Sequence, residues 1–138
     1  METVRKEVRC TSPMGELALR TWCMPGDTNP YGDIFGGWLM AQMDIAGAIT
    51  ANRVSCGRAV TIAVDKMEFH LPVSVGDVLC CYADVERLGN SSITIKIEAW
   101  VTRKNTSDHI KVTEGIFTYV AVDDNCQKRQ VPKQEEPS

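Results

Sequence analysis

The chain of 138 residues has few of the side chains that bind metals: two histidines, and six cysteines that form no C-x-x-C pair. His70 and His109 lie far apart in the sequence, and no Cys/His group has the spacing of zinc ligands, so we expect no metal site. The chain also lacks an excess of positive charge, since 15 Lys and Arg stand against 18 Asp and Glu. This balance does not favour broad binding to nucleic acid, and we expect no nucleic-acid partner.

Long apolar runs are missing as well. The most apolar stretch, residues 35–49, is interrupted by Gln42 and Asp44 and falls short of the roughly 20 apolar residues that a spanning helix needs. The first ten residues, METVRKEVRC, are charged and contain no apolar segment of the kind found in signal peptides. We therefore expect a cytoplasmic protein with reduced thiols and no membrane partner.

Composition and length predict one globular domain. Hydrophobic residues make up 43% of the chain and charged residues 24%, and a chain of this size can bury a core without disulfides. Residues 125–138 are polar with two prolines, which predicts a disordered tail. We expect the domain to span residues 15–124 and residues 1–14 to form a loosely ordered N-terminus.

One helix and five strands are predicted. Residues 37–54 contain no proline and are rich in Ala, Leu, Met and Ile, which favours a helix that ends near Gly57. Alternating segments predict strands at residues 16–24, 58–69, 77–88, 92–103 and 109–122. This order indicates an α+β fold with a curved antiparallel sheet. The helix is apolar on nearly all sides, so a second copy of the chain is the simplest cover for the part that the sheet leaves open.

Asp44 is the most informative residue because it lies among apolar residues in the middle of the predicted helix. An ionised carboxylate there costs several kcal/mol unless it is paired or hydrogen-bonded. It either lies on a narrow polar stripe near Gln42, meeting water or an arginine, or it serves as a general base or nucleophile in a cleft.

Two further features lie just before or at the start of this helix. Gly36 and Gly37 place free backbone amides where the helix dipole favours developing negative charge, as an oxyanion hole requires. The same pair also fits a flexible junction. Asn29, in the preceding loop, offers both a donor and an acceptor, although Asn is also a common turn residue.

The spacing of these residues predicts a dimer. Gly36 and Asp44 are eight residues apart, or roughly 12 Å along a helix, whereas a donor and a base must both lie about 3 Å from one reacting group. If two copies pack their helices side by side and antiparallel, Asp44 of one comes level with the glycine pair of the other. A two-fold dimer then contains two identical shared sites.

Residues 24–44, MPGDTNPYGDIFGGWLMAQMD, closely resemble the signature of the hot-dog-fold acyl-CoA thioesterases, in particular the bacterial YciA type. The likeness continues through GRAVTIAVDKMEFHLPVSVGDVLCCY, GNSSITIKIEAWV and GIFTYVAVD, and covers roughly residues 16–123. The fold implied by the resemblance is a long central helix wrapped by a curved antiparallel five-stranded sheet.

The activity implied by the resemblance is hydrolysis of acyl-CoA to free CoA and a carboxylic acid. Asp44 falls on the family's catalytic acid position, Asn29 on its loop asparagine, and Gly36 or Gly37 on the helix-start amide that polarises the thioester carbonyl. In this family these groups come from two subunits, and the dimers commonly assemble into hexamers, as trimers of dimers. Whether Asp44 attacks the thioester or deprotonates water stays open. CoA is substrate and product, so no cofactor is expected.

The phosphates of CoA need hydrogen-bond donors. The candidates are Arg58, Lys66 and Arg87, together with Gly89, Ser91 and Ser92 in a predicted turn, although each charge could simply be solvated. Two alternative functions use the same fold. A dehydratase is disfavoured because neither histidine precedes the helix, and a non-catalytic acyl-CoA binding or sensing module would release no thiol.

Overall fold

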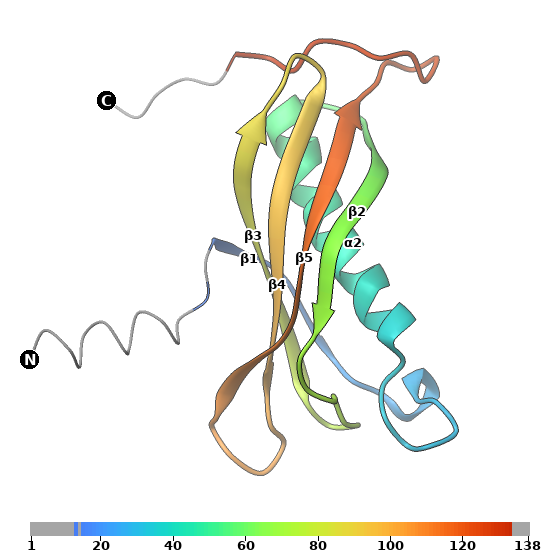
Figure 1. Cartoon of the computed structure of the whole chain (residues 1–138), viewed down its shortest axis with the longest axis vertical. Coiled ribbons are helices and arrows are strands. Elements are labelled where there is room, and N and C mark those ends of the chain that lie inside the picture. The colour runs from blue at the N-terminus through green and yellow to red at the C-terminus, as the bar shows by residue number, and fades with distance from the viewer. Residues whose placement is uncertain (1–12, 14, 134–138) are drawn as a thin grey trace, which may run out of the picture.

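The computed structural model describes residue 13 and residues 15–133. These residues form one long helix and a five-stranded antiparallel sheet (Figure 1). In chain order the elements are β1 (Glu16–Trp22), the 3-10 turn η1 (Pro25–Asp27), α2 (Gly36–Ser55), β2 (Ala59–Phe69), β3 (Val78–Leu88), β4 (Ser92–Thr102) and β5 (His109–Ala121). Each predicted helix or strand lies within two residues of these bounds, and the α+β fold class is confirmed.

The sheet has the strand order β1-β3-β4-β5-β2, and all neighbouring strands are antiparallel. Strands β3, β4 and β5 follow one another as hairpins, whereas β1 and β2 occupy the two edges. Helix α2 joins these edge strands and lies against one face of the sheet (Figure 1). This arrangement places the helix start at one end of the sheet and the β3–β4 turn at the other.

The core lies between α2 and the sheet. Leu39, Met43 and Ala46 of α2 are buried and face the strands, as expected for one stripe of a helix. On β4, alternate residues point inward and are buried, as the alternation of this segment predicts: Ile93, Ile95, Ile97, Ala99 and Val101.

The opposite face of β4 is less solvated than its alternation suggests. Glu98 and Trp100, which alternate with the inward-facing residues, are also buried. The Trp100 indole donates to Glu98 Oε1 at 2.9 Å, and its ring stacks on His109 at a centroid distance of 5.1 Å. The stacked rings of Trp100 and His109, and the hydrogen-bonded carboxylate of Glu98, therefore shield this part of the outer face from water.

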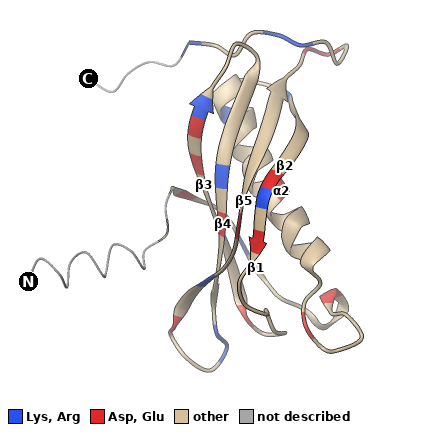
Figure 2. Ribbon diagram, in the orientation of Figure 1, with Lys and Arg blue, Asp and Glu red and all other residues tan. Residues whose placement is uncertain are grey.

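A single chain leaves apolar side chains of α2 open. Met40, Ile45 and Ile49 are 36%, 47% and 51% exposed, and Figure 2 shows α2 with very few charged residues. Ile62 and Val64 of the edge strand β2 are exposed as well. A single chain therefore leaves an apolar surface on α2 and β2 exposed, as expected if a second copy of the chain covers it. Within the described residues, no helix is both long enough and apolar enough to cross a membrane.

The C-terminal segment differs from the predicted disordered tail. The amide of Val131 donates to the carbonyl of Asn90 at 2.8 Å, and the Val131 side chain packs in the core. Arg129 donates from Nε to the carbonyl of Val122 at 2.9 Å. One apolar anchor and one arginine thus hold residues 125–131 against the domain, which extends past residue 124. The expectations for residues 1–12, 14 and 134–138 lie outside the described residues.

Candidate functional site

The Asp44 side chain lies partly exposed on α2, and two hydroxyl groups bind its carboxylate. Thr61 donates from Oγ1 to Asp44 Oδ1 at 2.7 Å, and the Tyr119 hydroxyl lies 3.0 Å from the same oxygen. The Tyr119 hydroxyl also lies 2.8 Å from the main-chain carbonyl of Asp44. None of the ion pairs formed within the described residues includes Asp44. No arginine among these residues therefore pairs with the Asp44 carboxylate.

The sheet register brings these two hydroxyls together. Thr61 on β2 is the direct cross-strand partner of Tyr119 on β5, and the β2 register shifts immediately after Thr61. Tyr119 is fully buried, and burial, followed by the negative charge of Asp44, raises the pKa of its phenol. The phenol therefore stays protonated and acts as a donor.

Sequence reasoning missed both Thr61 and Tyr119. The one available signal was the alternation of β5, which turns Tyr119 toward the helix together with Phe117. A buried tyrosine hydroxyl needs a hydrogen-bond partner, and Asp44 is the acidic residue of the facing helix. The pairing itself depends on a register between residues 58 positions apart, which local patterns do not reveal.

The start of α2 is open. Phe35 occupies the N-cap position without a capping side chain, and the first turn contains no acidic residue. The amide of Leu39 donates to the carbonyl of Phe35, so the amides of Gly36 and Gly37 precede the first helical hydrogen bond. A Cβ on Gly37 would meet no atom within 4 Å, whereas one on Gly36 would lie 3.3 Å from the Phe69 ring.

Asn29 is held as a donor beside this helix start. Its Oδ1 accepts the amides of Tyr31 at 2.9 Å and Asp33 at 3.1 Å, so its side-chain NH₂ group is the part left to bind another molecule. Asn29 and Gly36 line one cavity of about 340 Å³, together with Leu39, Phe69 and His70. Asp44 does not line this cavity, as the spacing along α2 predicts.

The residues predicted to bind phosphate fall into two groups. Lys66 and Arg87 line a groove of about 570 Å³ that also contains the acidic residues Asp65 and Glu86. Lys66 has a positive φ of 51° in a stretch of β2 where the register shifts again. This bulge separates the Lys66 side chain from the regular alternation of the strand.

The other group lies at the end of the sheet near the β3–β4 turn. The main-chain amide of Ala121 donates to Ser91 and that of Val122 to Arg58, so β5 brings Arg58 close to the turn. Gly89 and Ser92 close the turn through a hydrogen bond of 2.8 Å between amide and carbonyl. Within one chain, the residues predicted to bind phosphate therefore lie in two separate regions.

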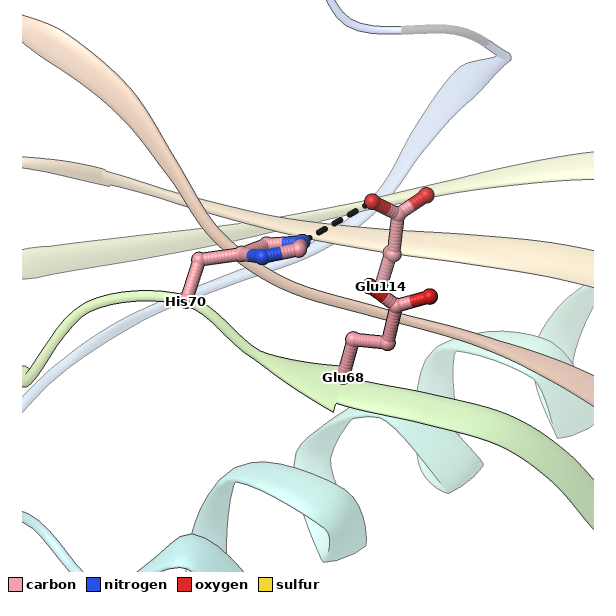
Figure 3. Close-up of side chains that lie close together, drawn as sticks. All are labelled: Glu68, His70 and Glu114. Carbon is pink, nitrogen blue, oxygen red and sulfur yellow. Dashed lines mark hydrogen bonds and ion pairs between the residues drawn. The ribbon is translucent and has the colours of Figure 1, made fainter.

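One group of potential metal ligands, Glu68, His70 and Glu114, was also missed (Figure 3). Their ligand atoms lie within 4.8 Å of one another, and the pattern E-x-H on β2 was a visible signal. However, His70 Nε2 already lies 2.9 Å from Glu114, and Lys111 and Lys96 lie 3.4 Å and 3.6 Å from the same carboxylate.

The side chains of Lys96 and Lys111 show that this cluster is an ion-pair network. Burial opposes ionisation of Glu114, but the hydrogen bond from His70 and the nearby charges of Lys111 and Lys96 lower the pKa of its carboxyl overall. The arrangement is an ion-pair network in which positive side chains occupy the places that a cation would take.

Comparison with known proteins identifies the family. Residues 31–106 match the family model described as the thioesterase superfamily. The chain is 54% identical over 127 residues to the acyl-CoA thioester hydrolase YciA of Salmonella typhimurium, covering 89% of this chain and 95% of that protein.

Two solved structures are also similar. The hexameric thioesterase y2039 of Yersinia pestis is 56% identical, with a TM-score of 0.86 over 89% of this chain and all of that one. HI0827, a hexameric broad-specificity acyl-CoA thioesterase studied as an aspartate-to-alanine variant, is 50% identical, with a TM-score of 0.85 over 87% and 88% of the two chains. With its single helix packed on a five-stranded antiparallel sheet and this degree of identity, the chain belongs to the thioesterase superfamily of hot-dog proteins and, within it, to the acyl-CoA thioester hydrolases of the YciA type.

Proposed function

We propose that this acyl-CoA thioester hydrolase works through a site shared by two copies of the chain. Asp44 comes from one copy, and Asn29 and the Gly36–Gly37 amides come from the other. The observation that carries this proposal is the state of Asp44: its carboxylate is held by two hydroxyls and forms no ion pair among the described residues. No positive side chain among the described residues competes for it, so the carboxylate is available to act on a substrate.

The open apolar surface of α2 supports the shared site. Asp44 lies between Met40 and Ile45, which are both exposed in a single chain. Burying these side chains against a second α2 contributes roughly 25 cal/mol for each Å² of apolar surface removed from water. An antiparallel pair of helices then brings Asp44 to the helix start of the other copy. Two similar enzymes are described as hexameric, and we propose the same assembly here, as a trimer of dimers.

The chemistry assigns a task to each group. The amides of Gly36 or Gly37 and the Asn29 NH₂ group donate to the thioester oxygen or to the attacking water, and these hydrogen bonds strengthen as charge develops on oxygen. Asp44 then acts in one of two ways. It attacks the carbonyl carbon and expels the CoA thiolate, so that water later cleaves the anhydride, or it removes a proton from water that attacks directly. Both routes yield CoA and a carboxylate.

The basic regions suit the phosphates of CoA. Lys66 and Arg87 share one groove, and their charges favour phosphate oxygens. Arg58 and the turn residues Gly89, Ser91 and Ser92 lie at the end of the sheet opposite the helix start. In an antiparallel pair, that end comes next to the other copy's helix start. We propose that the nucleotide part of CoA binds at one of these regions.

Subunit complementation tests the shared site. Asp44→Ala and Asn29→Ala are each expected to abolish thiol release from acyl-CoA, followed with a thiol reagent. When the two variants are unfolded together and refolded, half of the random dimers are mixed and contain one intact site. The mixture is therefore expected to regain roughly a quarter of wild-type activity. Variants refolded separately and then assayed together serve as the control, with Asp84→Asn on β3 as a matched aspartate substitution. No recovery in the mixture would place the whole site within one chain.

A further inference from the structure

We propose that Tyr119 is a positioning residue for Asp44: together with Thr61 it holds Oδ1 of the carboxylate and leaves Oδ2 as the oxygen that reacts. This inference rests on the proposed role of Asp44 and adds two things to it. It names the buried residue that orients the carboxylate, and it assigns the two carboxylate oxygens different tasks.

The geometry of the two donors is convergent. Thr61 Oγ1 and the Tyr119 hydroxyl both reach Oδ1, at 2.7 Å and 3.0 Å. They come from directly paired positions on β2 and β5, so the sheet fixes the distance between them. Two donors on one carboxylate oxygen restrict rotation of the carboxylate more strongly than a single donor does, since each must keep its own direction.

Gly47 makes room for the Tyr119 hydroxyl. A Cβ at position 47 would collide with the phenolic oxygen, so the ring end occupies the space that any other residue would fill. Both Gly47 and Tyr119 are buried. A glycine in the interior of a helix is less stable than alanine, and here that loss accompanies a hydrogen bond at the centre of the site.

The carboxylate is left asymmetric. In the part of the chain that the structure describes, the hydrogen bonds to the Asp44 side chain go to Oδ1. An oxygen that accepts two hydrogen bonds is stabilised and less reactive. Oδ2 therefore keeps the more available electron pair, whether it forms the bond to the thioester carbon or takes the proton from water.

A purely structural role for Tyr119 makes a different prediction. Its hydroxyl also lies 2.8 Å from the main-chain carbonyl of Asp44, so it could simply anchor α2 to the sheet. Loss of such an anchor would lower stability and leave the turnover of folded enzyme unchanged. The two roles are therefore separated by measuring kcat, KM and thermal stability on the same preparation.

The test uses Tyr119→Phe in the assembled enzyme, with thiol release from acyl-CoA as the readout. Phenylalanine keeps the buried ring and removes only the hydroxyl. We expect kcat to fall by roughly 10- to 100-fold with KM changed by less than about threefold, since the lost contact orients a reacting group and not the substrate. Tyr82→Phe is the matched control, because Tyr82 is a tyrosine of the same sheet whose hydroxyl contacts His109. An unchanged kcat, or a rise in KM alone, would overturn the proposal.

Two further variants keep the test decisive. Replacing Tyr119 with 4-aminophenylalanine returns an N–H donor to the same place and is expected to recover most of the lost kcat, which a packing role would not explain. The double variant Thr61→Val/Tyr119→Phe is expected to be no more than about threefold slower than the slower single variant, because both donors act on one carboxylate. Losses that multiply, or a failure of the amino analogue to recover kcat, would contradict the shared target.

An Asp44→Asn arm separates this inference from the proposed function. If Asp44→Asn is inactive while Tyr119→Phe keeps its full kcat, only the role of Tyr119 is wrong. If Asp44→Asn keeps its kcat, the proposed function itself is wrong.

Discussion

The two ends of α2 are completed in opposite ways. At the C-terminal end the chain supplies the partners itself. Cys56 adopts the left-handed conformation, with φ 56° and ψ 37°, and the amide of Gly57 donates to the carbonyl of Asn52 at 3.1 Å. The Arg129 guanidinium donates to the carbonyl of Ser55 at 2.8 Å. These contacts satisfy carbonyls that would otherwise end the helix without partners.

At the N-terminal end there is no capping side chain and no acidic residue in the first turn. Gly36 lines a cavity instead, and a Cβ on the neighbouring Gly37 would meet no atom within 4 Å. The chain thus satisfies the backbone groups at the C-terminal end of α2 and leaves open the N-terminal end, where we propose that the chemistry takes place. Backbone donors that are fixed in direction but unpaired can respond to charge that develops on a substrate.

The largest effect is expected at the open end. Gly37→Pro removes one N–H from the first turn without removing a helical hydrogen bond, because the amide of Leu39 is the first to donate within the helix. If that amide polarises the thioester carbonyl, kcat for thiol release falls by roughly 10²- to 10³-fold. The position offers space, since a Cβ on Gly37 would meet no atom within 4 Å.

Gly37→Ala is the matched variant, because it adds a methyl group and keeps the N–H. It is expected to lose far less activity than Gly37→Pro. Equal losses in the two variants would show that the amide at position 37 is not the donor and would move that role to Gly36. Circular dichroism of both variants checks that α2 still forms.

At the C-terminal end of α2, which we call the closed end, a smaller effect is expected, and it concerns stability. Arg129→Ala removes hydrogen bonds to the carbonyls of Ser55 and Val122 and a longer one of 3.3 Å to Arg58. Hydrogen bonds that involve a charged group contribute about 1.5–3 kcal/mol each, net of those to water, and the contributions of one side chain are not additive. We expect a loss of roughly 2–3 kcal/mol in the free energy of unfolding, measured by denaturant titration.

Arg129→Lys is the control for charge. It keeps the positive charge near the end of the helix and cannot reproduce the forked geometry, so it is expected to lie between alanine and the wild type. The kcat of the folded Arg129→Ala enzyme is expected to stay within about twofold of the wild type. A large fall in kcat at unchanged stability would break the distinction between the two helix ends.

The sequence predicts the elements of this fold well because their signals are local. The alternation of β4 and the absence of proline from α2 are visible within windows of about ten residues. The same holds for the open helix start, since two adjacent glycines and a loop asparagine are neighbours in the chain. These features need no knowledge of the packed structure.

The remaining parts of the site depend on contacts between distant segments. Thr61 and Tyr119 meet at Asp44 only because β2 pairs with β5 in one particular register. Arg129 reaches α2 because its segment lies against the end of β5, where the amide of Arg129 donates to the carbonyl of Ala121. The polar composition of residues 125–138 predicts disorder from average behaviour, but Val131 and Arg129 hold residues 125–131 against the domain.

The smallest effect is expected at Cys56, a non-glycine residue that adopts the left-handed conformation at the closed end of α2. A residue with a Cβ pays about 1–2 kcal/mol in the left-handed conformation, which glycine adopts freely at helix ends. Cys56 is exposed, so Cys56→Gly loses little packing, and the extra freedom of glycine in the unfolded chain offsets part of the gain. We expect the free energy of unfolding to rise by about 0.5–1 kcal/mol. Cys56→Ala removes the thiol but keeps the Cβ, so it is expected to stay near the wild type. Equal stability of the two variants would show that the left-handed backbone at position 56 costs nothing, and that the closed end of α2 is already at its optimum.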